Sequence, residues 1–232
     1  RTDPAGLSAD GLVEALALSD TELFVDYWPN GEPDSSLTGA SRIGNATAMT
    51  RFFNDVVGWD NAPQTPDFDE LRGLVKLRAN FAGSEFPAIH RMLKLFSYTA
   101  EIHERSRQKF LAHLAIIEGL LTHQPEPQDR IDTITQQLKR NIILLGNRMP
   151  PHHDLGLDTF GTTRPDKVIG RLYNYRSAIA HGGDPDSQLD IFKQKWPAPL
   201  TALELHRFAR TLTRRLLVAA LREPTLVTDL KG

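Results

Sequence analysis

The sequence predicts an all-α protein, in which an antiparallel bundle of four to five long helices follows an irregular N-terminal appendage. Apolar residues recur at steps of three and four over several long stretches after residue 66, which is the spacing of one helix face. Short turns separate these stretches, and short connections between long helices are typical of antiparallel bundles. The first 65 residues instead carry frequent Pro and Gly, which permit only short elements.

The composition limits the classes of function. The chain has 232 residues, of which 40% are hydrophobic and 24% charged, as in ordinary globular proteins. It has no Cys, which excludes disulfides, thiolate metal sites and cysteine nucleophiles. The formal charge is −2, so any binding of nucleic acid must depend on a local site rather than on net charge. No apolar run approaches the roughly 18 residues of a membrane helix, so we expect a soluble, cytoplasmic protein with no membrane partner.

Residues 1–65 are expected to form the appendage, or the end of an upstream domain. Leu12–Leu18 has the pattern of a short helix, Glu22–Trp28 that of a short strand and Ala46–Val57 that of a second helix. The turn-rich stretch Pro29–Gly44 is expected to be a loop. Since the chain begins at Arg1 and its first Met is Met49, we expect it to be a piece of a longer protein.

Residues 66–222 are expected to form the bundle, beginning with a helix whose first turn is acidic after Pro66. A second helical run starts near Pro87 and continues to Leu121. The polar patch His103–Lys109 is the expected break within that run, because very long uncapped periodic runs are unusual in globular proteins.

Three further helices complete the bundle. One ends at Gly146 and Asn147, which suit a helix C-terminus. The next opens on a capping-box pattern, Thr163-x-x-Asp166, and is stopped by two glycines. The expected ranges are 131–146, 163–181 and 201–221, and the apolar stripe of the second of these helices is Val168, Leu172, Tyr175 and Ile179.

The segment Tyr173–Gly183 (YNYRSAIAHGG) carries the most informative chemistry. Arg176 and His181 are five positions apart, which is about 140° around an ideal helix, so they share one face only if the helix ends between them. Gly182 and Gly183 fit such an end. Alternatively, the two side chains meet their counterparts from a second copy across a two-fold axis, which would pool two Arg and two His in one cleft.

The Arg-x4-His pattern followed by Gly, its flanks Tyr-x2-Arg-Ser and Ala-His-Gly, and the segment Ile-Ile-Glu-Gly-Leu-Leu at 116–121 resemble a HEPN domain (higher eukaryotes and prokaryotes nucleotide-binding), and most of all the ApeA-like HEPN group. The resemblance covers about residues 66–221. It implies a metal-independent endoribonuclease or RNA-binding domain, built as a homodimer without cofactors. It also implies a prokaryotic defence or toxin protein with an antitoxin or an upstream regulatory domain as partner.

The residue types fit the implied chemistry. A His can take the 2′-hydroxyl proton or protonate the leaving 5′-oxygen at neutral pH, and a guanidinium can donate two hydrogen bonds to the charged transition state. Arg176 and His181 are therefore the expected catalytic residues, with Tyr173, Asn174 and Ser177 as donors to phosphate or sugar. Because Ser177 stands where many catalytic HEPN motifs carry Asn, Asp or His, a non-catalytic dimerisation or ligand-binding module of a larger protein is the alternative.

A purely structural use of these residues also stays open. Arg176 pairs with an acid such as Glu118 in that case, and His181 caps the helix C-terminus. Glu118 lies among strongly apolar residues, so it is either a buried partner for an Arg, which we expect, or a solvent-facing residue at the stripe edge.

Other polar groups are expected to be structural. His152-His153-Asp154 lacks further ligands at useful spacing, so we expect a polar loop and no metal site. The basic stripe Arg207, Arg210 and Arg214 and the cluster His103–Lys109 are expected to be solvated faces rather than nucleic-acid tracks.

Overall fold

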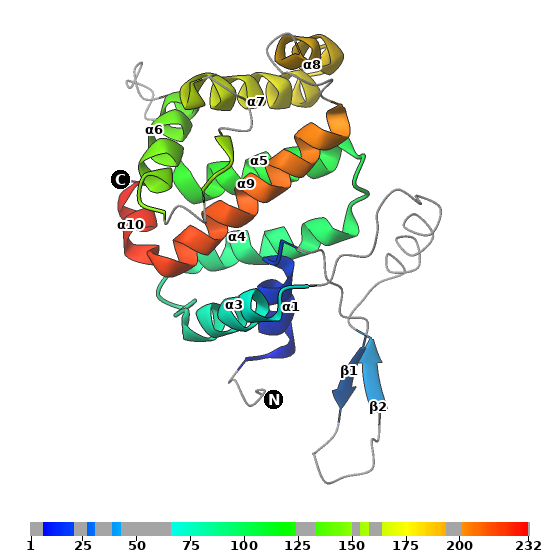
Figure 1. Cartoon of the computed structure of the whole chain (residues 1–232), viewed down its shortest axis with the longest axis vertical. Helices are drawn as coiled ribbons and strands as arrows, with labels where there is room; N and C mark the ends of the chain where they lie inside the picture. Colours follow the sequence, from blue (N-terminus) through cyan, green and yellow to red (C-terminus); the bar gives the residue numbers. More distant parts are fainter. Residues whose placement is uncertain are drawn as a thin grey trace. The chain divides into compact units, whose positions relative to one another are not determined.

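The structure is a computed structural model that describes residues 7–20, 27–30, 39–42, 66–123, 133–149, 154–157, 164–193 and 201–231 (Figure 1). The chain divides into two compact units, Arg1–Phe81 and Ala82–Gly232. The boundary therefore falls later than the expected one at residue 65, because the first long helix groups with the N-terminal unit.

The first unit is built on two helices, α1 (Ala9–Ala17) and α3 (Phe68–Asn80), which pack on each other. Ser8 caps α1 by accepting a hydrogen bond from the Gly11 N–H at 3.1 Å. Between the helices, Arg78 Nε lies 2.6 Å from a carboxylate oxygen of the buried Glu14. Both predicted helices of this part of the chain are confirmed where the structure describes it.

A β-hairpin also belongs to the first unit. Strand β1 (Tyr27–Asn30) pairs antiparallel with β2 (Gly39–Arg42), in the register Tyr27↔Arg42. The expected loop over Pro29–Gly44 is thus wrong at the residues that form these strands. Pro29 is tolerated in β1 because both strands of a two-stranded sheet are edge strands. A Pro, which has no N–H to donate, costs few hydrogen bonds there. Most of the expected strand Glu22–Trp28 and the whole expected helix Ala46–Val57 lie outside the described residues.

The second unit is an all-α bundle, as predicted. Its long helices are α4 (Pro87–Tyr98), α5 (Arg107–Leu121), α6 (Ile134–Gly146), α7 (Pro165–Ala180) and α9 (Ala202–Arg222). The short ones are the 3₁₀ helix η1 (Thr99–Glu101), α8 (Pro185–Lys193) and α10 (Pro224–Asp229). Helix α5 is central, since it contacts α4, α6, α7 and α9, and it runs beside α9 through the middle of the bundle (Figure 1).

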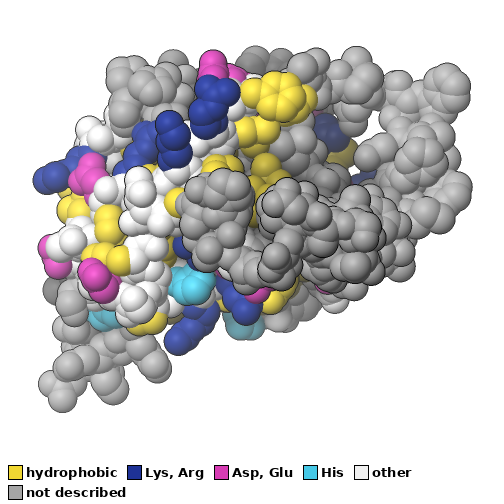
Figure 2. Space-filling view, turned by 90° about the horizontal axis from the view of Figure 1, so that it is seen from below, with side chains coloured by type: hydrophobic (Ala, Val, Ile, Leu, Met, Phe, Trp, Pro, Cys, Tyr) yellow, Lys and Arg dark blue, Asp and Glu magenta, His cyan; other side chains and the backbone are white. Residues whose placement is uncertain are grey.

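The apolar stripes meet in the core between these helices. On α5, Phe110, Leu114, Ile117 and Leu121 recur at helical spacing and are all buried, and so are Ile116 and Leu120. This wide buried surface is what a helix with neighbours on several sides requires. Among the described residues, the large hydrophobic side chains that stay exposed are Phe68, Leu95, Tyr98 and Leu144. Figure 2 shows one face of the molecule, on which Lys and Arg side chains lie in groups and hydrophobic side chains lie beside these groups.

Most helix ends follow the predicted signals. The run from Pro87 to Leu121 is broken inside the polar patch, where Ser106 caps α5 by accepting from the Gln108 N–H at 3.2 Å. Helix α6 ends at Gly146 with Asn147 as its C-cap, as expected. Helix α9 opens on a capping box formed by Thr201 and Glu204.

Helix α7 starts differently from the prediction and ends as predicted. Its N-cap is Arg164, which makes no side-chain cap bond, one position after the expected start. The expected capping box begins at Thr163, which lies outside the described residues. The C-terminus is a left-handed glycine cap, with Gly182 at φ +71° and the Gly183 N–H donating to the Ala178 carbonyl at 2.8 Å.

The sequence did not predict α8 or α10. Both begin with Pro at the first helical position, and they contain 9 and 6 residues, too few for an apolar period to stand out. None of the helices in the described part of the chain is both long and apolar enough to cross a bilayer.

Candidate functional site at the end of helix α7

Arg176 forms an ion pair with Glu118, which joins α7 to α5. Arg176 Nε lies 3.2 Å from Glu118 Oε1, and Nη2 donates to Oε2 at 3.3 Å. The side chains are 24% and 17% exposed respectively, so both are largely taken out of water. The expected pairing of Glu118 with an Arg is confirmed, and its side chain is half-buried rather than fully buried.

Burial of the Glu118 carboxylate makes its charge dependent on the ion pair with Arg176. Glu118 Oε1 is buried and, although close to the guanidinium, has no aligned hydrogen-bond donor. Burial raises the pKa of the Glu118 carboxyl, and the positive charge of Arg176 acts in the opposite direction. The charged form of Glu118 therefore depends on Arg176 staying in place.

The ring of Tyr173 also lies close to the guanidinium. Arg176 Cζ is 5.6 Å from the centre of the Tyr173 ring, within the range of a cation–π contact. Tyr173 precedes Arg176 by three positions, so one turn of α7 supplies both groups. Together with Glu118, the ring fixes the plane of a side chain that would otherwise be free to rotate.

His181 is placed differently. It is the C-cap of α7, where its backbone N–H donates to the Ser177 carbonyl at 3.0 Å, and its side chain is exposed. No hydrogen bond or ion pair of the described residues joins its imidazole to Arg176. Within one chain the two expected catalytic residues are therefore not joined, and their meeting across a two-fold axis stays a prediction.

The remaining expected site residues line the same helix. Asn174 is exposed and Ser177 is half-buried. Their side chains are therefore open to a ligand on the solvent side of α7, while Arg176 is directed to α5.

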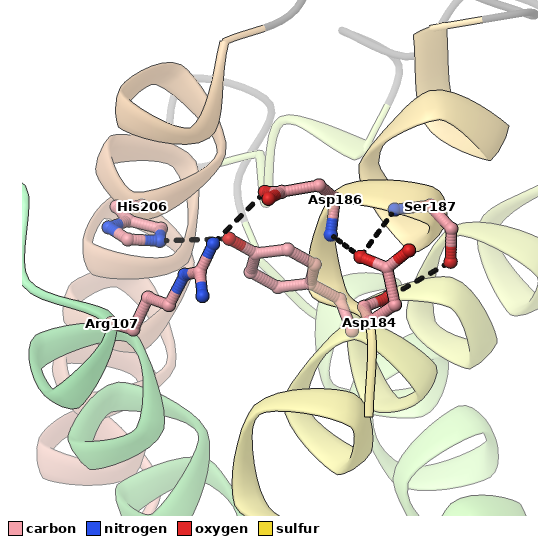
Figure 3. A network of polar contacts seen from close by, with 6 residues as sticks. Arg107, Asp184, Asp186, Ser187 and His206 are labelled. Carbon is pink, nitrogen blue, oxygen red and sulfur yellow. Dashed lines mark hydrogen bonds and ion pairs between the residues drawn. The ribbon is translucent and has the colours of Figure 1, made fainter. Parts of the chain in front are cut away.

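A second polar cluster, which the sequence did not predict, joins four helices (Figure 3). Tyr175 Oη on α7 is 3.4 Å from His206 Nε2 on α9, and Arg107 Nη2 on α5 donates to Asp186 Oδ1 on α8 at 3.0 Å. Burial raises the pKa of Tyr175. Burial also lowers the pKa of His206, although the backbone and the carboxylate of Glu104 act to raise it. Because Tyr175 and His206 are buried, their contact fastens α7 to α9, whereas Arg107 and Asp186 join α5 to α8 at the surface.

A buried tyrosine hydroxyl needs a partner, so Tyr175 on the apolar stripe was the signal for this cluster. The sequence could not say which residue would supply that partner. At the start of the nearby helix α8, Asp184 acts as a cap, and its Oδ1 accepts hydrogen bonds from the N–H groups of Asp186 and Ser187 at 3.0 and 3.2 Å.

The two basic clusters of the sequence converge in space. Burial acts to raise the pKa of Glu104, but Lys109, Arg210 and Arg207 hold it below its ordinary value. Lys109 is itself buried, with Nζ 2.7 Å from Glu104. Arg214 is buried as well. The expectation of two solvated faces is therefore wrong at Lys109 and Arg214, because tertiary packing covers them.

No cluster of three or more His, Cys, Asp or Glu that could hold a metal ion occurs among the described residues. His152 and His153 lie outside them. No protein-family model, curated protein or solved structure matches the chain. The HEPN resemblance consequently rests on the sequence of α5 and α7 alone.

Proposed function

We propose that the bundle binds RNA and cleaves it without a metal ion, through Arg176 and His181 of two copies of the chain. The observation that carries the proposal is that the end of one helix carries both an oriented guanidinium, held by Glu118, and an exposed imidazole. The resemblance to HEPN domains points the same way. It would make the protein part of a cytoplasmic prokaryotic defence or toxin system, controlled by an antitoxin or an upstream domain.

The reaction needs a base and an acid. One imidazole takes the proton of the 2′-hydroxyl, and the 2′-oxygen forms a bond to phosphorus as the bond from phosphorus to the 5′-oxygen breaks. An imidazolium then gives its proton to that 5′-oxygen. Each chain supplies one His at this helix end, so a homodimer supplies both roles.

The guanidinium stabilises the charge that develops on the phosphate. A planar group that is already oriented loses less freedom when it binds the transition state. Glu118 and Tyr173 supply that orientation, and Asn174 and Ser177 can donate hydrogen bonds to phosphate or sugar.

One observation favours a second candidate, a non-catalytic dimerisation or ligand-binding module. Glu118 already neutralises Arg176, so a phosphate must compete with a carboxylate for the same guanidinium. In a purely structural role, this ion pair simply holds α7 against α5.

Cleavage of end-labelled single-stranded RNA in EDTA tests the proposal. We expect wild type to cleave, and Arg176→Ala and His181→Ala each to lose about a hundredfold or more in rate. Arg91→Ala and His103→Ala are matched controls, because both side chains are exposed and neither lies on α7. If wild type leaves the RNA intact, or the two α7 variants cleave as well as the controls, the nuclease proposal fails and the non-catalytic module stands.

A further inference from the structure

One face of α7 is entirely polar or small. The positions i, i+3, i+4, i+7, i+10 and i+14 along a helix lie on the same side, and they begin here at Lys167. The buried residues of α7 lie on the opposite side. We call this face the polar stripe, and its members are Lys167, Gly170, Arg171, Asn174, Ser177 and His181.

The polar stripe carries positive charge that nothing in the described chain neutralises. Lys167 is exposed and Arg171 half-buried, and neither makes an ion pair with a described residue. The one acid of α7, Asp166, is held by Arg164, whose Nε and Nη2 donate to its two carboxylate oxygens at 3.0 and 3.1 Å. No carboxylate on α7 is therefore left to face these cations.

A third cation reaches the stripe from α6. A Cβ atom added at Gly170 would lie 3.1 Å from Lys139 Cε and 3.3 Å from Lys139 Nζ. The glycine thus leaves room for the ammonium group of Lys139 to lie against α7. Lys139 likewise makes no ion pair with a described residue, so three cations gather on one side of the helix pair α6 and α7.

We propose that the polar stripe binds the phosphates of a single RNA strand and leads the strand to His181; this inference rests on the proposed function. Lys167 and His181 are 14 positions apart, which is roughly 21 Å along a helix. Unpaired cations attract a phosphate backbone by releasing its counterions, and Asn174 and Ser177 can donate hydrogen bonds between the cations and His181.

Charge also decides against a second copy of the chain as the occupant. A symmetric pairing of two stripes would bring Lys139, Lys167 and Arg171 of both copies together, with no acid on either α7 free to compensate. A polyanion meets no such repulsion. A stripe one side chain wide also matches one backbone rather than a duplex.

The test measures RNA affinity against salt. A fluorescent single-stranded RNA is titrated with the full chain carrying His181→Ala, which prevents turnover, and with the same chain carrying Lys139→Gln, Lys167→Gln and Arg171→Gln in addition. Each phosphate contact on a single strand contributes about 0.7 to the slope of log K against log salt. We expect the triple change to reduce the slope by about 2, and the affinity at about 0.1 M salt roughly a hundredfold.

A second triple variant, Arg91→Gln, Lys94→Gln and Arg105→Gln, removes the same charge from exposed positions on α4 and before α5, and should keep the parent slope. Circular dichroism checks that each variant is folded. Equal losses in the two triple variants would overturn the inference, because net charge alone would explain them. So would an unchanged slope, or a change only in self-association measured by sedimentation.

The two proposals fail in different ways. If the parent chain binds no RNA at any salt concentration and wild type cleaves none, the proposed function itself is refuted. If wild type cleaves and the parent binds, but the Lys139, Lys167 and Arg171 changes leave the slope intact, only the polar stripe is refuted.

Discussion

His113 makes the folded bundle sensitive to acid. It lies on α5 with its side chain fully buried, and its ring is 5.7 Å from that of Phe96. Neither ring nitrogen has a hydrogen-bond partner. Burial, and then the positive charges of Lys109 and Arg210 and the nearby His206, lower the pKa of His113 to about 3. The imidazole is therefore neutral in the folded protein at every pH well above that value.

The sign of the effect follows from the unfolded chain, in which the pKa of His113 returns to 6.5. Between 6.5 and 3 the unfolded chain binds a proton that the folded chain does not, so the free energy of unfolding decreases as the pH falls. Each pH unit in this window is worth about 1.36 kcal/mol. Lowering the pH from 7 to 5 thus removes about 2 kcal/mol, and lowering it to 3, where the folded chain also begins to bind the proton, removes about 4 kcal/mol.

The assay compares urea unfolding, followed by circular dichroism, at pH 7 and pH 5 for wild type and His113→Leu. Leu fills a similar volume and leaves no buried polar atom unpaired, so we expect it to be at least as stable as wild type at pH 7. It should lose about 2 kcal/mol less than wild type at pH 5. Contributions of other groups, such as His206, cancel in this comparison.

An exposed histidine provides the control. His103→Leu removes an imidazole that is exposed, so the stability lost between pH 7 and pH 5 should match that of wild type. If His113→Leu lost as much stability as wild type between pH 7 and pH 5, His113 would not be buried neutral and the reasoning would be refuted.

Four further changes test the packing and the site. Asn141→Leu should destabilise the bundle by about 2 kcal/mol, because Asn141 Nδ2 donates to the last carbonyl of α5 at 2.7 Å and to the C-cap carbonyl of α10 at 3.0 Å; a urea midpoint equal to wild type would contradict this. A double-mutant cycle of Arg176→Ala and Glu118→Gln should give a coupling energy of about 1 to 2 kcal/mol, whereas a value near zero would mean that the pair is absent in solution. Gly182→Ala should cost about 1 to 2 kcal/mol, seen as a lower Tm, because φ is +71°; an unchanged Tm would show that the cap is relaxed. Thr201→Ala should cost about 1 kcal/mol and speed amide exchange in the first turn of α9, and unaltered exchange would argue against the capping box.

The helix ends that the sequence predicted are those with local causes. Gly182 and Gly183 stop α7 because the first adopts a left-handed conformation that other residues avoid. The polar patch after Glu101 breaks the second run because Ser106 can cap a new helix there. Helix α8 was missed although Asp184 and Pro185 form a start signal, since nine residues give too few turns to show a period.

The pairing of Glu118 was predictable, and the convergence on Glu104 was not. An acid among apolar residues needs a cation, and Arg176 at the edge of a neighbouring stripe was one candidate. Glu104 is approached by Lys109 on α5 and by Arg207 on α9, which are far apart in sequence. Only the packing of α9 along α5 brings these charges together, and periodicity within each helix contains no information on that packing.

The different surroundings of Arg176 and His181 follow from their spacing on α7. Five positions rotate one side chain by about 140° from the other, so burial of Arg176 against Glu118 on α5 leaves His181 on the solvent side, at the end of the polar stripe. An RNA strand that follows the stripe therefore meets His181 without meeting Arg176 of the same chain. We infer that a site using both residues needs the end of α7 from a second copy, which could bring a guanidinium to the side where the imidazole is exposed.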